Sequence, residues 1–413
     1  MSTSIRLPLP VRAFNVAARP LARAWLSLDG EALLREASRR AQLEDFGDPG
    51  FREGLARLLG ALEGEAELTP LGRVIARRDV LRLLTNRLEM NAWRARHSEI
   101  GAERVERPIF VIGMGRTGTT ILHDLLAQDP ANRVPHSWEV ARPCPPPERG
   151  HADDDPRIAE IDAELAGTDR LIPEFKKMHP MGARLPQECV AITAHEFASM
   201  LHQTTYRVPS YAAWLHEQAD LAPVYAAHRR FLQLLQWRWP GERWVLKSPG
   251  HLWALGSVLK EYPDARFVQT HRDPLRIVAS LASLVEMLRS MTSRRVDRKQ
   301  IAREWMEQIA VALDRSVDAR VHGALDSSRI VDLSFRELLA DPFAGIRRVY
   351  ERFGLEYRAD AEARMRRFLS ENPSEKHGAH RYRFADTGLD AGEARERFRR
   401  YVEHFDVPAE SLD

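Results

Sequence analysis

The amino-terminal part of the chain spaces its apolar residues with the period of an α-helix. Between about residues 30 and 100, three stretches repeat apolar residues at intervals of three and four, which predicts helices that bury one face. The stripes are Ala32, Leu33, Leu34, Ala37 and Ala41, then Phe51, Leu55, Leu58, Leu59 and Leu62, and less regularly Val74, Ile75, Val80, Leu81, Leu83 and Leu84. No pattern there indicates chemistry, so we expect an accessory helical layer.

At residue 108 a short apolar run replaces the helical period. Residues 109–112 form the run, and the sequence Gly113-Met114-Gly115-Arg116-Thr117-Gly118-Thr119-Thr120 follows it. The apolar residues after that turn fall on one helical face again: Ile121, Leu122, Leu125 and Leu126. The pattern predicts a buried strand, a glycine-rich turn and a helix. The glycines permit close approach of an anion, to which the helix would offer free N–H groups.

The same alternation of strand, loop and helix recurs further along the chain. Residues 244–246 are followed by Lys247-Ser248-Pro249-Gly250-His251 and a helical stripe, and residues 266–270 are followed by His271-Arg272-Asp273-Pro274 and another stripe. Residues 329–333 read as a fourth strand. This order predicts an α/β fold in which helices flank a parallel sheet.

The glycine-rich turn departs from the loop that binds nucleoside triphosphates. That motif is G-x-x-x-x-G-K-[ST], in which the lysine reaches the β- and γ-phosphates and the hydroxyl holds magnesium. Gly113 and Gly118 have the required spacing, but Thr119 stands at the lysine position, and the cation of the turn is Arg116. This favours a shorter anionic group and no metal. A magnesium–ATP-dependent kinase and a turn without any ligand are the alternatives.

Three of the predicted strands end near a cation: Arg116, Lys247 and Arg272. The carboxyl ends of the strands form the ligand-binding edge of an open parallel sheet. Three cations at that edge indicate a polyanionic ligand. Ser280 follows Arg272 by eight residues. The two side chains can face the same side only if the chain folds back between the strand and the helix.

Two pairs of neighbouring histidine and glutamate residues are candidates for acid–base or metal chemistry. His136 and Glu139 follow the loop helix and could act as acid or base, or equally as a capping histidine and a surface glutamate. His195-Glu196 begins like the H-E-x-x-H zinc motif, but Ser199 stands where the second histidine is required. We therefore expect no metal site, and a core or solvated histidine at position 195.

Composition narrows the class of protein. The 61 basic residues nearly cancel the 59 acidic ones, so no bulk charge supports nucleic-acid binding. With two cysteines, Cys144 and Cys189, the chain has no disulfide framework, which favours a reducing compartment such as the cytoplasm. No apolar stretch approaches the ~20 residues of a membrane span.

The first 28 residues have an unusual charge pattern. Arg6, Arg12, Arg19 and Arg23 precede the first acid, Asp29, and apolar residues lie among them. We favour a packing arm or a subunit contact. A peripheral membrane contact or a targeting peptide is the alternative. Oligomeric state is not indicated by the pattern.

The turn of residues 113–120, with its cation before Thr-Gly-Thr-Thr, resembles the 5′-phosphosulfate loop of the sulfotransferases. Arg272 and Ser280 resemble the 3′-phosphate-binding pair of that family, and Lys247-Ser248-Pro249 resembles its middle strand end. Residues 330–355 and His380-Arg381-Tyr382 look like a bacterial branch of the superfamily. The resemblance is closest over residues 106–285. It implies a P-loop-type sulfotransferase domain over 106–413 with a helical acceptor cap at 150–240, preceded by a helical extension over 1–105.

The resemblance implies that 3′-phosphoadenosine 5′-phosphosulfate donates a sulfonate to a hydroxyl or amine of a small-molecule or lipid acceptor, without a metal. Arg116 would stabilise charge as the sulfonate leaves, and Lys247 could share that role. His380 or Arg381 could close over the 3′-phosphate. The implied donor-binding residues are Gly115, Arg116, Thr117, Gly118, Thr119, Thr120, Arg272, Ser280, His380 and Arg381.

The general base is where the sequence departs from part of the family. Many members have a histidine two residues after the middle-strand lysine, but this chain has Pro249 there, and the nearest histidine is His251. Another branch uses a glutamate shortly after the loop helix, a place comparable to that of Glu139. We favour Glu139 over His251, with His136 behind them. If the protein is not an enzyme, the alternative is a nucleotide-binding protein without catalysis.

Overall fold

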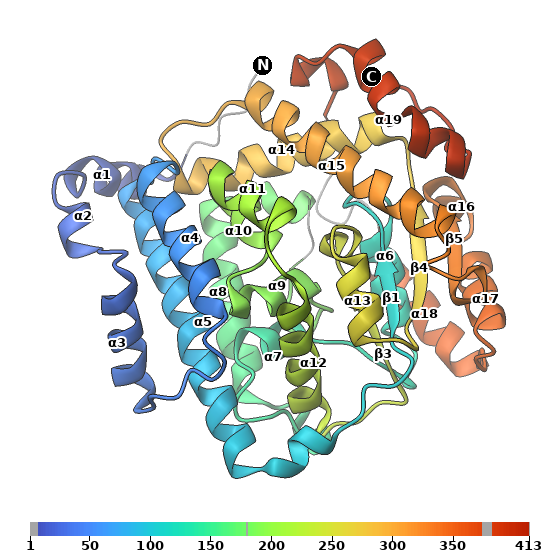
Figure 1. Ribbon diagram of the computed structural model, residues 1–413, viewed down its shortest axis with the longest axis horizontal. Coiled ribbons are helices and arrows are strands. Elements are labelled where there is room, and N and C mark those ends of the chain that lie inside the picture. Colours follow the sequence, from blue (N-terminus) through green and yellow to red (C-terminus); the bar gives the residue numbers. More distant parts are fainter. Residues whose placement is uncertain (1–6, 179–180, 374–381, 413) are drawn as a thin grey trace.

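A five-stranded parallel sheet lies at the centre of the computed structural model, which describes residues 7–178, 181–373 and 382–412 (Figure 1). The strand order is β2–β3–β1–β4–β5. The strands are β1 (Ile109–Ile112), β2 (Asn132–Arg133), β3 (Arg243–Lys247), β4 (Arg266–His271) and β5 (Ile330–Ser334). In the central strand Val111 pairs with Lys247 on one side and with Val268 on the other. The loop after β1 therefore starts between the ends of β3 and β4.

Alternate residues of the strands enter two separate cores, as a pleated strand requires. Ile109 and Val111 face a cluster formed with the helices α6 (Thr119–Leu126), α16 (Phe335–Ala340), α17 (Pro342–Arg352) and α18 (Ala359–Glu371). Phe110 and Ile112 face the larger cluster on the opposite side of the sheet. Both faces are covered, which is the usual condition for a parallel sheet.

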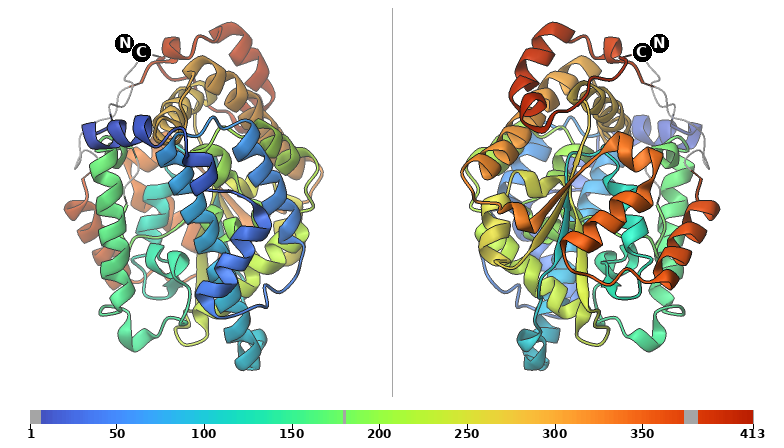
Figure 2. Two further views of the ribbon diagram at one scale, coloured as in Figure 1. Left: turned by 90° about the vertical axis from the view of Figure 1, so that its left-hand side faces the viewer. Right: turned by 90° about the vertical axis from the view of Figure 1, so that its right-hand side faces the viewer.

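The helices of the larger cluster come from most of the chain. They include α3 (Gly30–Ala41), α4 (Phe51–Gly64), α5 (Pro70–Arg96), α9 (Cys189–Thr193), α11 (Pro209–Glu217), α12 (Ala222–Gln236), α13 (Leu255–Glu261), α14 (Pro274–Thr292), α15 (Arg298–Val321) and α19 (Ala391–Phe405). Figure 2 shows the blue amino-terminal helices on one side of the molecule and the orange helices α16 and α17 on the other. The remaining helices are α1 (Leu9–Ala17), α2 (Ala22–Trp25), α7 (Ser137–Ala141), α8 (Pro156–Leu171) and α10 (Met200–Thr205).

The predicted α/β fold with a parallel sheet is confirmed. The three amino-terminal stripes are the helices α3, α4 and α5, and the four predicted strands are β1, β3, β4 and β5. The short strand β2 was not expected, because it consists of two polar residues and carries no apolar run. Among the described residues, no helix is long and apolar enough to cross a membrane.

The division at residue 105 stays a prediction, but the two parts share one core. Leu33 of α3 and Leu84 of α5 belong to the same buried cluster as Phe110 of β1. His380 and Arg381 lie outside the described residues.

Candidate functional site

The loop between β1 and α6 is held by close contacts at both of its ends. Gly113 has φ +135°, and a Cβ at this position would lie 2.5 Å from Thr270 Oγ1 on β4. Gly118 has φ +91°, and a Cβ there would lie 3.0 Å from Leu338 on α16. Gly115 has neither restriction, because its φ is not positive and an added Cβ would meet no atom of the described residues within 4 Å. Two of the three glycines are therefore required by the fold, and the third leaves open space.

Thr117 ties the loop to the sheet. Its hydroxyl donates to the carbonyl of Met114 at 2.6 Å and lies 2.6 Å from the hydroxyl of Thr270. The side chain is buried, so these bonds fix the loop without occupying its outer surface. The backbone of the loop leads directly into the N terminus of α6, where the free N–H groups carry a positive partial charge. The loop is thereby a preformed cradle for an anion.

Arg116 has a left-handed backbone, with φ +76°, which is uncommon for a residue with a side chain. Its Nε donates to Ser280 Oγ at 3.0 Å, and its Nη1 donates to the carbonyl of Met178 at 2.6 Å. Burial lowers the pKa of Arg116, and the neighbouring charge of Arg272 lowers it further. The loop cation thus lies against α14 in this structure, on the side of Ser280.

Arg272 lies at the end of β4, beside the same loop. Its Nη1 donates to the carbonyl of Arg116 at 2.9 Å, and its guanidinium stacks on the ring of Phe335, 3.9 Å from the centroid. The remaining donors bind the carboxylate of Glu410, with Nε at 3.0 and 3.2 Å and Nη2 at 2.9 Å. Arg272 therefore already grips an anionic group through two nitrogens, which is how arginine holds phosphate.

The predicted neighbourhood of Arg272 and Ser280 exists, and Arg116 connects the two residues. Arg116 bonds Arg272 through its carbonyl and Ser280 through its side chain. Ser280 is fully buried on α14, which begins two residues after Arg272. The turn at Asp273 supplies the fold-back that the eight-residue spacing requires, because its side chain caps α14 by accepting from the N–H of Leu275.

Lys247 lies at the end of β3, on the other side of the loop. Its Nζ donates to Thr120 Oγ1 at 3.4 Å and forms an ion pair with the carboxylate of Glu188. The lysine is almost wholly buried, and the Glu188 side chain is one-fifth exposed. A cation, a hydroxyl and a carboxylate thus meet at the first turn of α6. The sequence prediction included Lys247 and Thr120 but not Glu188.

Glu139 is fully buried in a network of its own. It forms an ion pair with Arg133, which also donates at 3.0 Å, and it accepts from the backbone N–H of His136 at 2.8 Å. Burial raises the pKa of Glu139, but Arg133 and His136 more than offset this and hold it at about 2. His136 lies 3.2 Å from the carboxylate and stacks on Trp239. Together the histidine and the glutamate cap α7, which is a structural role.

His251 is buried behind the middle strand. Its Nδ1 lies 2.7 Å from the hydroxyl of Tyr225, its ring meets Phe110 edge-on, and its Nε2 has no hydrogen-bond partner among the described residues. Burial lowers the pKa of His251 well below its ordinary value, and the neighbouring His228 adds to this effect. The imidazole is therefore neutral at physiological pH, as a base must be.

An apolar hollow adjoins the ends of β3 and α9. It is lined mainly by carbon-rich side chains of α9–α12, together with Ser248, His251 and Cys189, the residue after Glu188 in the chain. The aromatic and aliphatic lining includes Met200, Leu215, Val224, Tyr225 and Trp253. The hollow lies within and beside residues 150–240, where a cap over the acceptor was expected. Its lining is mainly apolar, and it encloses about 30 Å³ in this structure, so an acceptor would have to widen it.

Four contacts in this region were not predicted. Phe335 directly follows β5, so the rule of strand ends could have found it. The other three have no such signal. Glu188 lies between helices without a strand or glycine beside it, Glu410 lies in the carboxyl-terminal segment, and the Met178 carbonyl comes from a residue far away in the chain. Only the three-dimensional arrangement shows them. Among the described residues, no group of three or more histidine, cysteine, aspartate or glutamate side chains could hold a metal ion.

A glycine loop thus follows the central strand of a parallel α/β sheet, and cations lie at the ends of both neighbouring strands. The model of the sulfotransferase family matches residues 108–359. The chain belongs to the sulfotransferase family.

Its relatives include mycobacterial enzymes. The omega-hydroxy-beta-dihydromenaquinone-9 sulfotransferase Stf3 of Mycobacterium bovis is 26% identical over 289 residues, which cover 65% of this chain and 68% of the relative. The crystal structure of sulfotransferase STF1 from Mycobacterium tuberculosis H37Rv has a TM-score of 0.80 and 35% identity, covering 90% of this chain and 98% of that one. Sulfotransferase STF9 from Mycobacterium avium has a TM-score of 0.85 and 31% identity, covering 92% and 98%.

Proposed function

We propose that this sulfotransferase transfers the sulfonate of 3′-phosphoadenosine 5′-phosphosulfate to the hydroxyl, or amine, of an apolar small-molecule or lipid acceptor. The observation that carries the proposal is that two anion-binding positions flank one loop. Arg272 grips a carboxylate at one end, and Lys247 meets Thr120 at the other. A donor with separate 3′ and 5′ anionic groups fits this arrangement.

The loop would hold the 5′ end of the donor. The N–H groups of residues 117–120 and the hydroxyls of Thr119 and Thr120 supply donors at the helix N terminus. Arg272 and Ser280 would hold the 3′-phosphate, and for this Glu410 has to leave Arg272. His380 and Arg381 stay candidates for closing over that phosphate.

Lys247 is better placed than Arg116 to stabilise charge on the oxygen that the sulfonate leaves. Lys247 Nζ contacts the first turn of α6, whereas the Arg116 guanidinium contacts Ser280 and Met178. As the acceptor oxygen bonds to sulfur, the bond from sulfur to the 5′-phosphate oxygen breaks and negative charge moves onto that oxygen. A buried cation that already lies there stabilises this charge without reorganisation.

We assign the base role to Glu188 in preference to Glu139. Glu188 contacts Lys247 at the donor loop and neighbours the apolar hollow through Cys189. Its carboxylate would accept the proton of the acceptor hydroxyl as the new oxygen–sulfur bond forms. Glu139 has its oxygens occupied by Arg133 and His136. His251, neutral and at the hollow, is the second candidate.

The apolar lining of the hollow supports an apolar acceptor, and the name of one relative agrees with this. The relative Stf3 is named for a menaquinone-derived acceptor, which is a lipid with an ω-hydroxyl group. A lipid alcohol would place its hydroxyl beside Lys247 and Glu188 and its hydrocarbon part against the lining of the hollow.

The donor is tested by calorimetry with adenosine 3′,5′-bisphosphate and, separately, with ATP plus magnesium. We expect the bisphosphate to bind more tightly. Arg272→Ala should weaken its binding by about 2 kcal/mol, roughly 30-fold, because a charge-assisted contact is lost. Arg303→Ala, an exposed arginine on α15, is the matched control and should leave binding unchanged.

Tighter binding of magnesium–ATP would favour a kinase and overturn the proposed donor. To detect turnover, purified protein and labelled donor are incubated with a panel of lipid and phenolic alcohols, and labelled products are counted. Tight bisphosphate binding without any labelled product across the panel would favour a nucleotide-binding protein without catalysis.

A further inference from the structure

The first two helices expose an unusual amount of apolar surface. Among the residues that the structure describes, nine large apolar side chains are exposed, and five of these lie between residues 9 and 25. They are Leu9, Phe14, Val16, Leu21 and Trp25, of which Leu9, Val16 and Trp25 are at least 70% exposed. None of the residues of α1 is buried. Figure 1 places α1 and α2 at one edge of the molecule. An apolar cluster of this kind marks an interaction surface.

The inner side of α1 is anchored, so its outer side has a fixed orientation. Asn15 accepts a hydrogen bond from the N–H of Leu71 on α5 at 2.9 Å. Before the helix, Leu7 packs against the buried cluster of Ile172, Phe175 and Met291. On the outer side, Leu9 and Val16 are seven residues apart and therefore lie in one stripe. The exposed apolar surface of α1 is therefore held in place by contacts with the rest of the fold.

The charge around these apolar side chains is positive. The chain has no acid before Asp29. Arg12 and Arg19 have no ion pair with any residue in the described ranges. Arg23 lies 3.9 Å from Glu63, with both side chains partly exposed. Apolar residues together with arginines, in a segment that has no acid of its own, are the composition of surfaces that bind anionic lipids.

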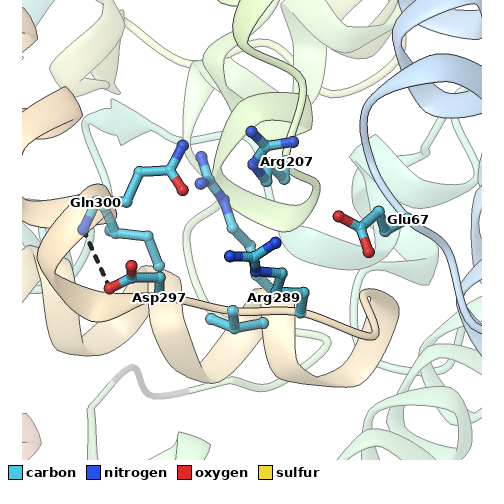
Figure 3. Close-up of a pocket in the computed structure, with 8 residues that line it drawn as sticks. Glu67, Arg207, Arg289, Asp297 and Gln300 are labelled. Carbon is cyan, nitrogen blue, oxygen red and sulfur yellow. Dashed lines mark hydrogen bonds between the residues drawn. The ribbon is translucent and has the colours of Figure 1, made fainter.

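Two hollows lie at this edge, and the first extends the basic character beside α2. Arg19, Arg23 and Arg294 line the first, which also includes Glu63 and Glu67. Glu67 is shared with a second hollow, into which Arg207 and Arg289 point (Figure 3). Arg295 and Asp297 also line the second hollow. In the first hollow arginines outnumber carboxylates, so anionic headgroups at this edge would be attracted to it. In the second, Arg289 is ion-paired with Glu304, and the remaining arginines and carboxylates balance.

We propose that α1 and α2 form a docking surface for an anionic lipid bilayer. Leu9, Val16 and Trp25 enter the interfacial region, and Arg12 and Arg19 meet lipid phosphates. Apolar burial and charge attraction act together in such contacts, and neither has to be strong alone. A tryptophan suits the position, because indole is favoured at the membrane–water boundary.

The docking surface borders the candidate site. Leu7 and Met181 both pack against the buried cluster that contains Phe175, and the carbonyl of Met178, three residues after Phe175, accepts from Arg116. A bilayer on α1 and α2 would therefore lie beside a wall of the site. The idea that a lipid acceptor passes from the bilayer to the site rests on the proposed function. The docking to a bilayer does not rest on it, because vesicle binding is measured without turnover.

The test is flotation of the full chain with vesicles, at low and high salt. We expect binding to vesicles of phosphatidylglycerol and phosphatidylcholine, weak binding to phosphatidylcholine alone, and release at high salt. Leu9→Ser, Val16→Ser and Trp25→Ser combined should abolish binding. Arg12→Gln and Arg19→Gln should each lower it about fivefold. The control is Val321→Ser with Leu339→Ser, two exposed apolar residues elsewhere that should make no difference.

Three results would overturn the proposal. The first is no binding of the unaltered chain to the anionic vesicles. The second is an equal loss of binding in the Val321 and Leu339 control. The third is a stable dimer, seen by sedimentation without lipid, that the Leu9, Val16 and Trp25 changes convert to monomer, since a second copy would then cover the surface. Bisphosphate affinity of the same variants should stay unchanged, which separates this test from that of the donor.

Discussion

Glu410 and Arg272 form a bidentate ion pair in which Arg272 Nε and Nη2 donate to one carboxylate at 2.9–3.2 Å. The Glu410 side chain is one-fifth exposed, and the backbone N–H of Glu410 donates to Asp273 at 2.8 Å. A residue of the carboxyl-terminal segment thus occupies the arginine to which we assign the 3′-phosphate. Carboxylate and phosphate cannot use the same two nitrogens at once.

The Glu410→Gln change should strengthen bisphosphate binding, because the competing negative charge is removed. We expect a gain of three- to tenfold, about 1 kcal/mol, since the pair is partly exposed and partly screened. Titration calorimetry at constant salt measures it. Glu403→Gln, an exposed glutamate on α19, is the matched control. Unchanged or weaker binding in Glu410→Gln would show that Glu410 does not compete.

The two glutamates should differ in their effect on turnover when each is changed to glutamine. Glu188→Gln should lower turnover at least 100-fold, the usual contribution of a general base, and should also lower Tm, because the buried Lys247 loses its ion-pair partner. Glu139→Gln should lower Tm, because it leaves the buried Arg133 without its partner at a cost of about 3–5 kcal/mol. Kinetics and thermal unfolding of both variants decide the assignment. Full activity of Glu188→Gln would move the role to His251.

Asp124 predicts a pH dependence of stability. Burial raises the pKa of this carboxyl from 3.8 to about 7, although Lys247 opposes the shift. Between about pH 4 and pH 7 the folded chain holds a proton that the unfolded chain has lost. The free energy of unfolding should therefore fall as the pH rises through this range. The contribution is at most about 4 kcal/mol, from 1.36 kcal/mol per unit of pKa.

Asp124→Asn should flatten that dependence, which urea unfolding at several values between pH 5 and pH 8 would reveal. Asp153→Asn, at an exposed site, is the control and should keep the slope of the unaltered chain. A slope that persists in Asp124→Asn would assign the dependence to other groups.

Substitutions at two glycines of the loop should affect stability and bisphosphate binding differently. Gly113→Ala should destabilise the chain by about 2 kcal/mol or more, because φ is +135° and the new Cβ would lie 2.5 Å from Thr270 Oγ1. Gly115→Ala has open space and should keep its Tm. If an anion approaches the loop at this point, Gly115→Ala should nevertheless bind the bisphosphate more weakly. Thermal unfolding and calorimetry on both variants make the comparison.

The fold could be predicted from local patterns. The strands β1, β3 and β4 are buried along nearly their whole length and each contains a short apolar run, whereas β5 exposes Asp332. The helical stripes of α3 and α4 have a clear period, and that of α5 is less regular. The strand β2 could not be found in this way. Its residues Asn132 and Arg133 are polar, and the pairing with β3 depends on the neighbouring strand.

The candidate site could be predicted only where its residues follow a strand. Arg116, Lys247 and Arg272 gather because the ends of neighbouring parallel strands share an edge. Glu188 and Glu410 reach that edge from segments without such a rule, so their approach depends on how distant helices pack. The spacing that suggested Glu139 is real, but its carboxylate faces Arg133 and the cap of α7.

The contact between α5 and α14 limits how the chain can be divided. Thr69 donates its N–H to the carbonyl of Thr292 at 2.8 Å, and a Cβ on Gly72 would lie 2.0 Å from the same oxygen. The far end of the helix that carries Ser280 is therefore seated on the amino-terminal layer. A fragment trimmed to the stretch that the family shares would lose this support, and with it the buried neighbours of Leu33 and Leu84. For expression or engineering, the first hundred residues should therefore be kept, because they support the helix that carries Ser280.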